Sequence, residues 1–232
     1  MNKRKSPQQN YMVIGVTVIV AVVAVAIAIV LLNSSSADAA DVNYSEIAQT
    51  RTENGGFVIG DPEAPITIVA FEDFLCPHCQ AYKSTVNQIM EQLVATGQAR
   101  FEFRMLATQG ADALNLFRVA ECAGELNASG FWPVHDEIFS MTSSGRVQRS
   151  DIPREIADKF NISYTELLQC TTTADQFETD QRLANTVNAT GTPAIRFRYG
   201  GIEAPLETMQ QFASGAPGFT TLKGIVEAAN ET

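Results

Sequence analysis

The residues with the clearest chemical potential stand together in the stretch FEDFLCPHCQ, 71–80. Cys76 and Cys79 flank Pro77 and His78, so this stretch holds two of the chain's four cysteines and one of its two histidines. Two thiols at this spacing can form a redox pair, supply two ligands to zinc, or make a structural disulfide. Which of these applies depends on the rest of the chain.

The remaining cysteines favour redox chemistry. A zinc site usually needs a second close pair of ligands, whereas Cys122 and Cys170 stand alone and far apart. A purely structural disulfide closing a loop of about four residues would stabilise little, since this stabilisation grows with loop length. The sequence therefore predicts a redox centre at Cys76 and Cys79.

The flanking residues predict the elements that position this centre. Residues 66–74, ITIVAFEDF, are rich in β-branched and aromatic side chains, which is typical of a buried central strand. Apolar residues at helical spacing follow in 80–97, and Gly97 offers a stop. The order is strand, CPHC, helix.

This order predicts a role for each residue of the motif. Pro77 suits the first turn of a helix, which places Cys76 at or next to the N-cap, where the helix dipole stabilises a thiolate. Cys76 is then the nucleophile and Cys79, one turn further on, resolves the mixed disulfide. His78 adds a hydrogen-bond donor near the sulfur. A dithiol stabilised in its reduced form is an oxidant.

Composition and missing motifs exclude other functions. The chain has 232 residues, 45% of them hydrophobic and 18% charged, which suits one globular domain with a membrane anchor. Its formal net charge of -10 argues against nucleic acid as a partner. No G-x-S-x-G, G-x-G-x-x-G or Walker motif is present, so we expect no metal, flavin or nucleotide.

The N-terminus predicts export. Basic residues within 1–10 precede an uncharged apolar run, 11–32, long enough to cross a bilayer. The positive-inside rule keeps 1–10 in the cytoplasm, so we expect a single-pass cell-membrane protein with its catalytic domain on the extracytoplasmic side. A signal peptide cleaved near 37–39, releasing a secreted form, is the alternative. Residues 33–60 are expected to be a flexible spacer.

The middle of the chain predicts a helical module. A second strand is expected at 99–106, followed by helices at 111–126, 131–141, 151–160 and 163–170. Cys122 and Cys170 fall within this module. In an exported chain we expect them to form a structural disulfide, the alternative being two buried free thiols.

The last part of the chain returns to an α/β pattern. A helix at 177–189 precedes Thr192 and Pro193, then a strand, AIRFRY, and a closing helix from Phe219. The segment between that strand and the closing helix is long, and its role cannot be inferred from the sequence.

Together these motifs resemble the DsbA-like family of thiol-disulfide oxidoreductases, specifically the membrane-anchored, BdbD-like, thioredoxin-4 type branch. The resemblance rests on DPEAPITIVAFEDFLCPHC and on the later TGTP, in that order. It implies an α/β thioredoxin fold with an inserted helical subdomain, preceded by one transmembrane helix. The expected boundaries are 61–107 and 175–232 for the thioredoxin-like domain and 108–174 for the insertion.

The resemblance also implies site residues. Cys76 would be the attacking thiolate, with Pro77 and His78 tuning its potential. Thr192 and Pro193 would form the cis-proline loop that faces Cys76 and pairs with an extended substrate peptide. Many relatives carry a buried acid where this chain has Ala70. Glu72 shares the strand face of that position, which makes it a candidate proton shuttle.

The expected function is an oxidase that introduces disulfides into exported proteins, with the Cys76–Cys79 disulfide in place of a cofactor. By analogy, a DsbB-like or VKOR-like membrane protein would reoxidise it, and we expect a monomer. A reductase or isomerase on the same scaffold is one alternative. A non-catalytic peptide-binding or chaperone module, which would need no cysteines, is another.

Overall fold

The computed structural model describes residues 42–209, 212 and 215–231. The expected membrane anchor, 11–32, lies outside these residues. Within the part of the chain that is described, no helix is both long and apolar enough to cross a membrane.

A five-stranded mixed sheet forms the centre of the domain, in the order β1-β2-β4-β3-β5. Its strands are β1 (Gln49–Arg51), β2 (Phe57–Ile59), β3 (Ile66–Glu72), β4 (Arg100–Met105) and β5 (Ala194–Tyr199). β3 pairs parallel to β4 and antiparallel to β5, and β2 extends the sheet antiparallel to β4. Every residue of β3 is buried, as expected for the strand that leads to the CPHC motif.

Part of the expected spacer belongs to the sheet. β1 and β2 lie within 33–60 and pair with each other, so the domain begins earlier than the predicted boundary at residue 61. That prediction was wrong because strands of only three residues show no readable alternation. A tight turn joins these two strands, in which the Thr52 N–H donates to the Gly56 carbonyl at 3.0 Å.

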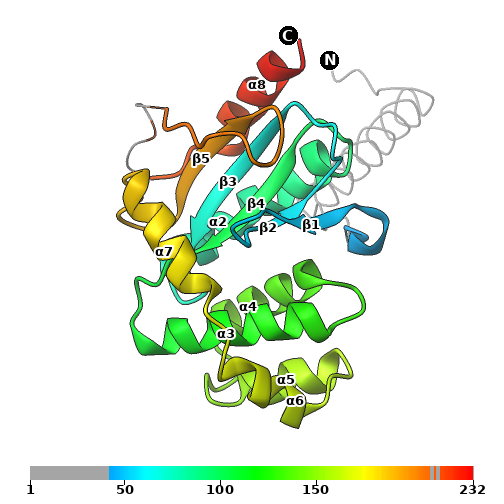
Figure 1. Ribbon diagram of the computed structural model, residues 1–232, viewed down its shortest axis with the longest axis vertical. Helices are drawn as coiled ribbons and strands as arrows, with labels where there is room; N and C mark the ends of the chain where they lie inside the picture. Colours follow the sequence, from blue (N-terminus) through cyan, green and yellow to red (C-terminus); the bar gives the residue numbers. More distant parts are fainter. Residues whose placement is uncertain (1–41, 210–211, 213–214, 232) are drawn as a thin grey trace, which may run out of the picture. The chain divides into compact units, whose positions relative to one another are not determined.

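Some helices cover the sheet, and others form a separate group at one of its ends. α2 (Pro77–Ile89) continues into a π-helical turn (Met90–Val94), and α8 (Phe219–Asn230) closes the chain. The inserted helices are α3 (Ala111–Leu126), α4 (Phe131–Ser144), α5 (Ile152–Lys159) and α6 (Tyr164–Thr171), followed by α7 (Gln176–Thr186). Figure 1 shows α3 to α6 gathered at one end of the sheet and α8 at the other. The expected α/β architecture with an inserted helical subdomain is confirmed.

One face of the sheet is apolar. Ile68, Ala70, Phe101, Phe103 and Phe197 are fully buried and belong to one core cluster with residues of α2, α4 and α8. Burying this much apolar surface is the main stabilising contribution to such a domain. The active-site helix α2 is therefore fixed on the sheet by its buried face.

The opposite face carries buried charge. Glu102 Oε1 accepts a hydrogen bond from Arg104 Nε at 2.5 Å, and Glu102 Oε2 accepts one from Arg198 Nε at 2.8 Å. Arg104 also pairs with Asp180 of α7 at 2.8 Å, and Arg104, Glu102 and Asp180 are fully buried. Glu102 is thus shared by two arginines, so its loss leaves both without this partner.

We expect Glu102→Gln to destabilise the domain by about 3–5 kcal/mol, since removing one partner of a buried ion pair leaves uncompensated buried charge. Urea unfolding at neutral pH measures the change. The matched control is Glu125→Gln, because Glu125 pairs with Arg51 at the surface, with side-chain exposures of 51% and 34%. That variant should cost at most about 1 kcal/mol. Equal losses in the two variants would contradict this reading of the charged layer.

The long segment after β5 extends the sheet by one bridge. The N–H groups of Phe197 and Glu207 each donate to the other residue's carbonyl, at 3.1 and 2.8 Å. The chain then returns past α2, where the Tyr82 hydroxyl donates to the Pro217 carbonyl at 2.7 Å. This segment therefore reaches the surface beside the CPHC motif.

Candidate active site

The CPHC motif begins where β3 ends. Cys76 is the N-cap residue of α2, with an extended backbone, and Pro77 occupies the first turn. The Gln80 N–H donates to the Cys76 carbonyl at 3.0 Å, and the Cys76 N–H donates to the Asp73 carbonyl at the same distance. The turn that leaves the strand thus places the Cys76 sulfur at the positive end of the helix.

The two cysteines differ in access. Both are free thiols; Cys76 is 4% exposed and Cys79 is not exposed at all. The Cys76 thiol donates to the Thr192 carbonyl oxygen, with a sulfur–oxygen distance of 3.3 Å. The Thr192–Pro193 peptide bond is cis. The structure therefore brings together the CPHC and TGTP motifs, which lie far apart in the sequence.

Cys79 lies in surroundings that oppose a thiolate. Burial raises the pKa of its thiol, and repulsion from Glu72 raises it further. Hydrogen bonds from the Asp73 N–H, at 3.5 Å from the sulfur, and from the Thr192 side chain act in the opposite direction. Cys79 is thus suited to the inner position of the pair, where it carries a proton in the reduced state.

Glu72, at the end of β3, is a buried acid close in sequence to the CPHC motif. Its side chain is fully buried, and neither carboxyl oxygen has a hydrogen-bond partner. Burial raises its pKa from 4.5 to about 8, the nearby Lys83 lowers it, and Asp136 raises it. Glu72 is therefore protonated at neutral pH, and its charge, once it ionises, raises the pKa of the Cys79 thiol.

A cleft lies next to the CPHC motif, and its lining includes Thr192, whose carbonyl oxygen accepts from the Cys76 thiol. Its volume is about 400 Å³, and it is lined from α2 and from both sides of the TGTP loop by His78, Tyr82, Thr190, Gly191, Thr192, Pro193, Ala194, Gly215 and Ala216. Pro77 and His78 are exposed, and His78 belongs to the lining of this cleft. Three residues expected at the site, His78, Thr192 and Pro193, thus line one cleft.

A model of the thioredoxin family, Thioredoxin_4, matches residues 52–210. The chain belongs to this thioredoxin family. The match begins after β1, which agrees with the structure in placing the start of the domain before residue 61.

Curated relatives of this thioredoxin-family chain include two Bacillus proteins. Disulfide bond formation protein D of Bacillus subtilis is 24% identical over 145 residues, which cover 60% of this chain and 65% of the relative. Probable disulfide bond formation protein D of Bacillus cereus is 24% identical over 123 residues, covering 53% and 54%. The matched region spans less than two thirds of either relative.

Solved structures share the fold. BdbD of Bacillus subtilis, in its oxidised form, has a TM-score of 0.60 and 21% identity, covering 75% of this chain and 92% of its own. Alpha-DsbA1 of Wolbachia pipientis has a TM-score of 0.64 and 19% identity, covering 77% and 92%. The expected thioredoxin fold with inserted helices is confirmed.

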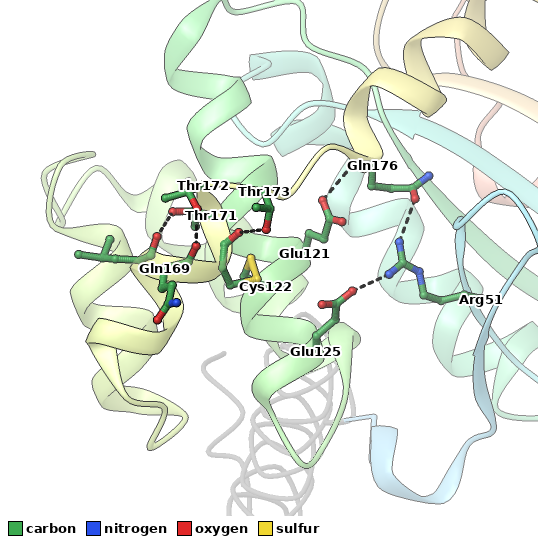
Figure 2. The surroundings of a disulfide bond; sticks show 11 residues. Arg51, Glu121, Cys122, Glu125, Gln169, Thr171, Thr172, Thr173 and Gln176 are labelled. Atoms are coloured by element: carbon green, nitrogen blue, oxygen red, sulfur yellow. Dashed lines mark hydrogen bonds and ion pairs between the residues drawn. A yellow bond between two sulfur atoms is a disulfide. The ribbon is translucent and has the colours of Figure 1, made fainter.

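The second pair of cysteines lies in the inserted helices of this thioredoxin-family domain. Cys122 of α3 and Cys170 of α6 are joined by a disulfide, 48 residues apart in sequence. Figure 2 shows polar contacts from α3 beside it: Glu125 accepts from Arg51 at 2.8 Å, and Glu121 accepts from the Gln176 N–H at 3.1 Å. The disulfide thus joins α6 to α3, a helix that also contacts β1 and α7.

Removing this disulfide by Cys122→Ser and Cys170→Ser should lower stability by about 4 kcal/mol, because it closes a long loop in the unfolded chain. Thermal unfolding measures the loss. The double variant should keep the chemistry of Cys76 and Cys79 below its unfolding temperature. A lower rate of thiol-disulfide exchange at Cys76 and Cys79 in the folded double variant would contradict a purely structural role for the Cys122–Cys170 disulfide.

The second histidine does not belong to the site. His135 is fully buried among aromatic side chains, and its Nδ1 lies 2.8 Å from Asp136 Oδ1. Burial lowers the pKa of His135. Among the described residues, no group of three or more His, Cys, Asp or Glu side chains is arranged to hold a metal.

Two residues near the thiols, Asp73 and Thr108, were not identified as site residues from the sequence. Asp73 is buried, and its carboxylate accepts hydrogen bonds from the Leu75 and Thr108 N–H groups at 2.9 and 2.7 Å. The one available signal was an Asp in the turn before a helix, a position where this side chain commonly binds backbone N–H groups. No sequence signal indicated Thr108, which follows β4.

Proposed function

We propose that the chain is a thiol:disulfide oxidoreductase that oxidises exported proteins through Cys76 and Cys79. The observation that carries this proposal is the pairing of an N-cap cysteine at a cleft with an inner, fully buried cysteine. The names of the Bacillus relatives, disulfide bond formation protein D, support it.

The reaction starts from the Cys76–Cys79 disulfide. A substrate thiolate attacks the Cys76 sulfur, a bond forms between substrate and Cys76, and the bond to Cys79 breaks. Cys79 leaves with the electron pair and takes a proton. A second substrate thiolate then attacks the substrate sulfur, so that the substrate gains its disulfide and Cys76 leaves as a thiolate. The substrate loses two electrons and the enzyme gains them.

Glu72 is the proposed source of the proton for Cys79. It is protonated at neutral pH because burial raises its pKa to about 8. Repulsion from an ionised Glu72 raises the pKa of the Cys79 thiol, so the two groups are electrostatically coupled. A proton passed from Glu72 to Cys79 would neutralise the leaving thiolate in a region that disfavours charge. Glu72 would thus serve in place of the acid that many relatives carry at the position of Ala70.

The cleft is the proposed substrate site. Thr192 and Pro193 present backbone to an extended peptide, and Pro77 and His78 form the opposite edge, where they tune the Cys76 sulfur. We also propose that residues 11–32 anchor the chain in the cell membrane with this cleft outside, and that a quinone-linked membrane protein of the DsbB-like or VKOR-like kind reoxidises it.

The test is transfer of a disulfide to a reduced, unfolded ribonuclease by the oxidised full-length protein. We expect one substrate disulfide for each protein molecule consumed, and none with Cys76→Ser. The matched control is the Cys122→Ser, Cys170→Ser double variant, which should transfer as the wild type does. If the Cys76→Ser variant helped the ribonuclease to fold as well as the wild type does, a peptide-binding or chaperone module would be favoured instead.

A further inference from the structure

Asp73 joins two loops at the active site. Its Oδ1 accepts from the Leu75 N–H at 2.9 Å, within the turn that leads to Cys76. Its Oδ2 accepts from the Thr108 and Gln109 N–H groups, at 2.7 and 2.9 Å, and from the Thr108 hydroxyl at 3.0 Å. Asp73 is fully buried, whereas Thr108 is exposed. The loop after β4 is thus fixed to the turn before Cys76 through one buried carboxylate.

The Thr108 hydroxyl extends this network to the TGTP loop. The Thr108 and Thr192 hydroxyl oxygens lie 3.1 Å apart, so the two side chains are in hydrogen-bond contact. The Thr192 carbonyl oxygen in turn accepts from the Cys76 thiol at 3.3 Å. Thr108 therefore links the buried Asp73 to the loop that faces the Cys76 sulfur.

The position of Thr108 relative to the cleft determines how it can act. Thr192 and Pro193 belong to the lining of the cleft, and Thr108 does not. A substrate in the cleft would meet the TGTP loop, so Thr108 acts on it through Thr192. The bonds from Asp73 to Thr108 and from Thr108 to Thr192 use no sulfur atom, so they do not depend on the redox state of Cys76.

We propose that Thr108, held by Asp73, is a positioning residue that fixes the TGTP loop for pairing with an extended substrate peptide. This inference rests on the proposed oxidoreductase function and deepens it, because it concerns the choice of substrate. A peptide that pairs with the backbone of the loop reaches the Cys76 sulfur correctly only if the loop is in place. A small dithiol makes no such pairing. Thr108 thus favours peptide substrates over small dithiols.

The test compares two dithiols as reductants of the oxidised full-length protein. One is an extended peptide with two cysteines, and the other is dithiothreitol, which has no peptide backbone. In both reactions a dithiol thiolate attacks the Cys76 sulfur, and Cys79 leaves with the electron pair and takes a proton. The second dithiol thiolate then closes the dithiol's own disulfide, and Cys76 leaves as a thiolate. Two electrons pass from the dithiol to the protein.

The second-order rate constants for the two dithiols are measured by acid quenching at successive times. Thr108→Val removes the hydroxyl but keeps the N–H bond to Asp73, and the exposed position of Thr108 leaves the core unchanged. We expect the rate constant for the peptide to fall about threefold, the scale of one lost hydrogen bond, while that for dithiothreitol stays at the wild-type value. Thr108→Ser keeps the hydroxyl and should keep both wild-type constants.

A double variant shows whether Thr108 acts through Thr192. In a Thr192→Val background the hydroxyl that Thr108 holds is absent, so Thr108→Val should lower the peptide rate constant no further. An unchanged peptide constant in Thr108→Val, equal falls for both dithiols, an equal fall in Thr108→Ser, or an effect that persists in the Thr192→Val background would overturn the inference. If the wild type oxidised neither dithiol, the proposed function itself would fail.

Discussion

Cys79→Ser is expected to trap a substrate on Cys76 as a stable mixed disulfide. The variant keeps the Cys76 thiol, which is 4% exposed at the N-terminus of α2, and loses only the sulfur of Cys79, which is not exposed at all. Attack by Cys76 on a substrate disulfide can therefore proceed. Resolution of the mixed disulfide cannot, because no thiol is left at position 79 to attack the Cys76 sulfur. Catalytic turnover is lost completely.

Mass spectrometry of the quenched protein measures this trapping. One substrate equivalent should stay bound to Cys79→Ser and be released by a small thiol. The matched variant is Cys76→Ser, which keeps the inner thiol and should bind none, since Cys79 is fully buried. If Cys76→Ser trapped the substrate, the roles of attacking and resolving cysteine would be reversed. If Cys79→Ser trapped none, the assignment of these roles would fail.

Glu72→Gln is expected to slow disulfide transfer on the order of 10²-fold at pH 7, the lower end of what a general acid contributes. The amide fills the same space but cannot give a proton to the leaving Cys79. In the wild type the rate should fall as pH rises through about 8, where Glu72 ionises. In the variant this fall should be missing. Stopped-flow rates between pH 6 and about 9 measure both effects.

The same substitution should stabilise the domain at neutral pH. The pKa of Glu72 is raised from 4.5 to about 8 in the folded state, so the unfolded chain releases this proton first. Stability of the wild type therefore falls as pH rises from 4.5 to about 8, and the cost is constant above that range. Glu72→Gln removes this cost, so the free energy of unfolding should rise by an amount on the order of 3 kcal/mol at pH 7.

Glu121→Gln is the matched control for Glu72→Gln. Burial also raises the pKa of Glu121, but this residue lies in α3, where it accepts from the Gln176 N–H. Its substitution should leave the transfer rate and its pH dependence at wild-type values. A Glu72→Gln protein with normal rates would exclude Glu72 from proton transfer, even if its stability rose as expected.

The sequence predicted the centre of the site because its signals are local. β3, the CPHC motif and the start of α2 follow one another in the chain, and Pro77 marks the first turn of the helix. Strand alternation also placed Glu72 on the face of Ala70, and Glu72 is indeed buried there. Its lack of a hydrogen-bond partner depends on tertiary packing, which no local pattern contains.

Other features could not be predicted because they depend on segments distant in sequence. The alternation of Phe101 and Phe103 with Glu102 and Arg104 identified β4, but it could not show that the polar face is also buried, with Arg104 paired to Asp180 of α7. The contact between Thr108 and Thr192 likewise joins two loops 84 residues apart. β1 and β2 were missed since each has only three residues.

The reduction potential of the Cys76–Cys79 pair tests the central claim most directly. The full-length protein would be titrated in glutathione buffers with Cys122 and Cys170 left in place, and the oxidised fraction read after acid quenching. An oxidase of exported proteins predicts a value near about -120 mV, at the oxidising end of the thioredoxin-fold scale. A value near about -270 mV would mean that electrons flow towards the substrate, and the protein would then be a reductase.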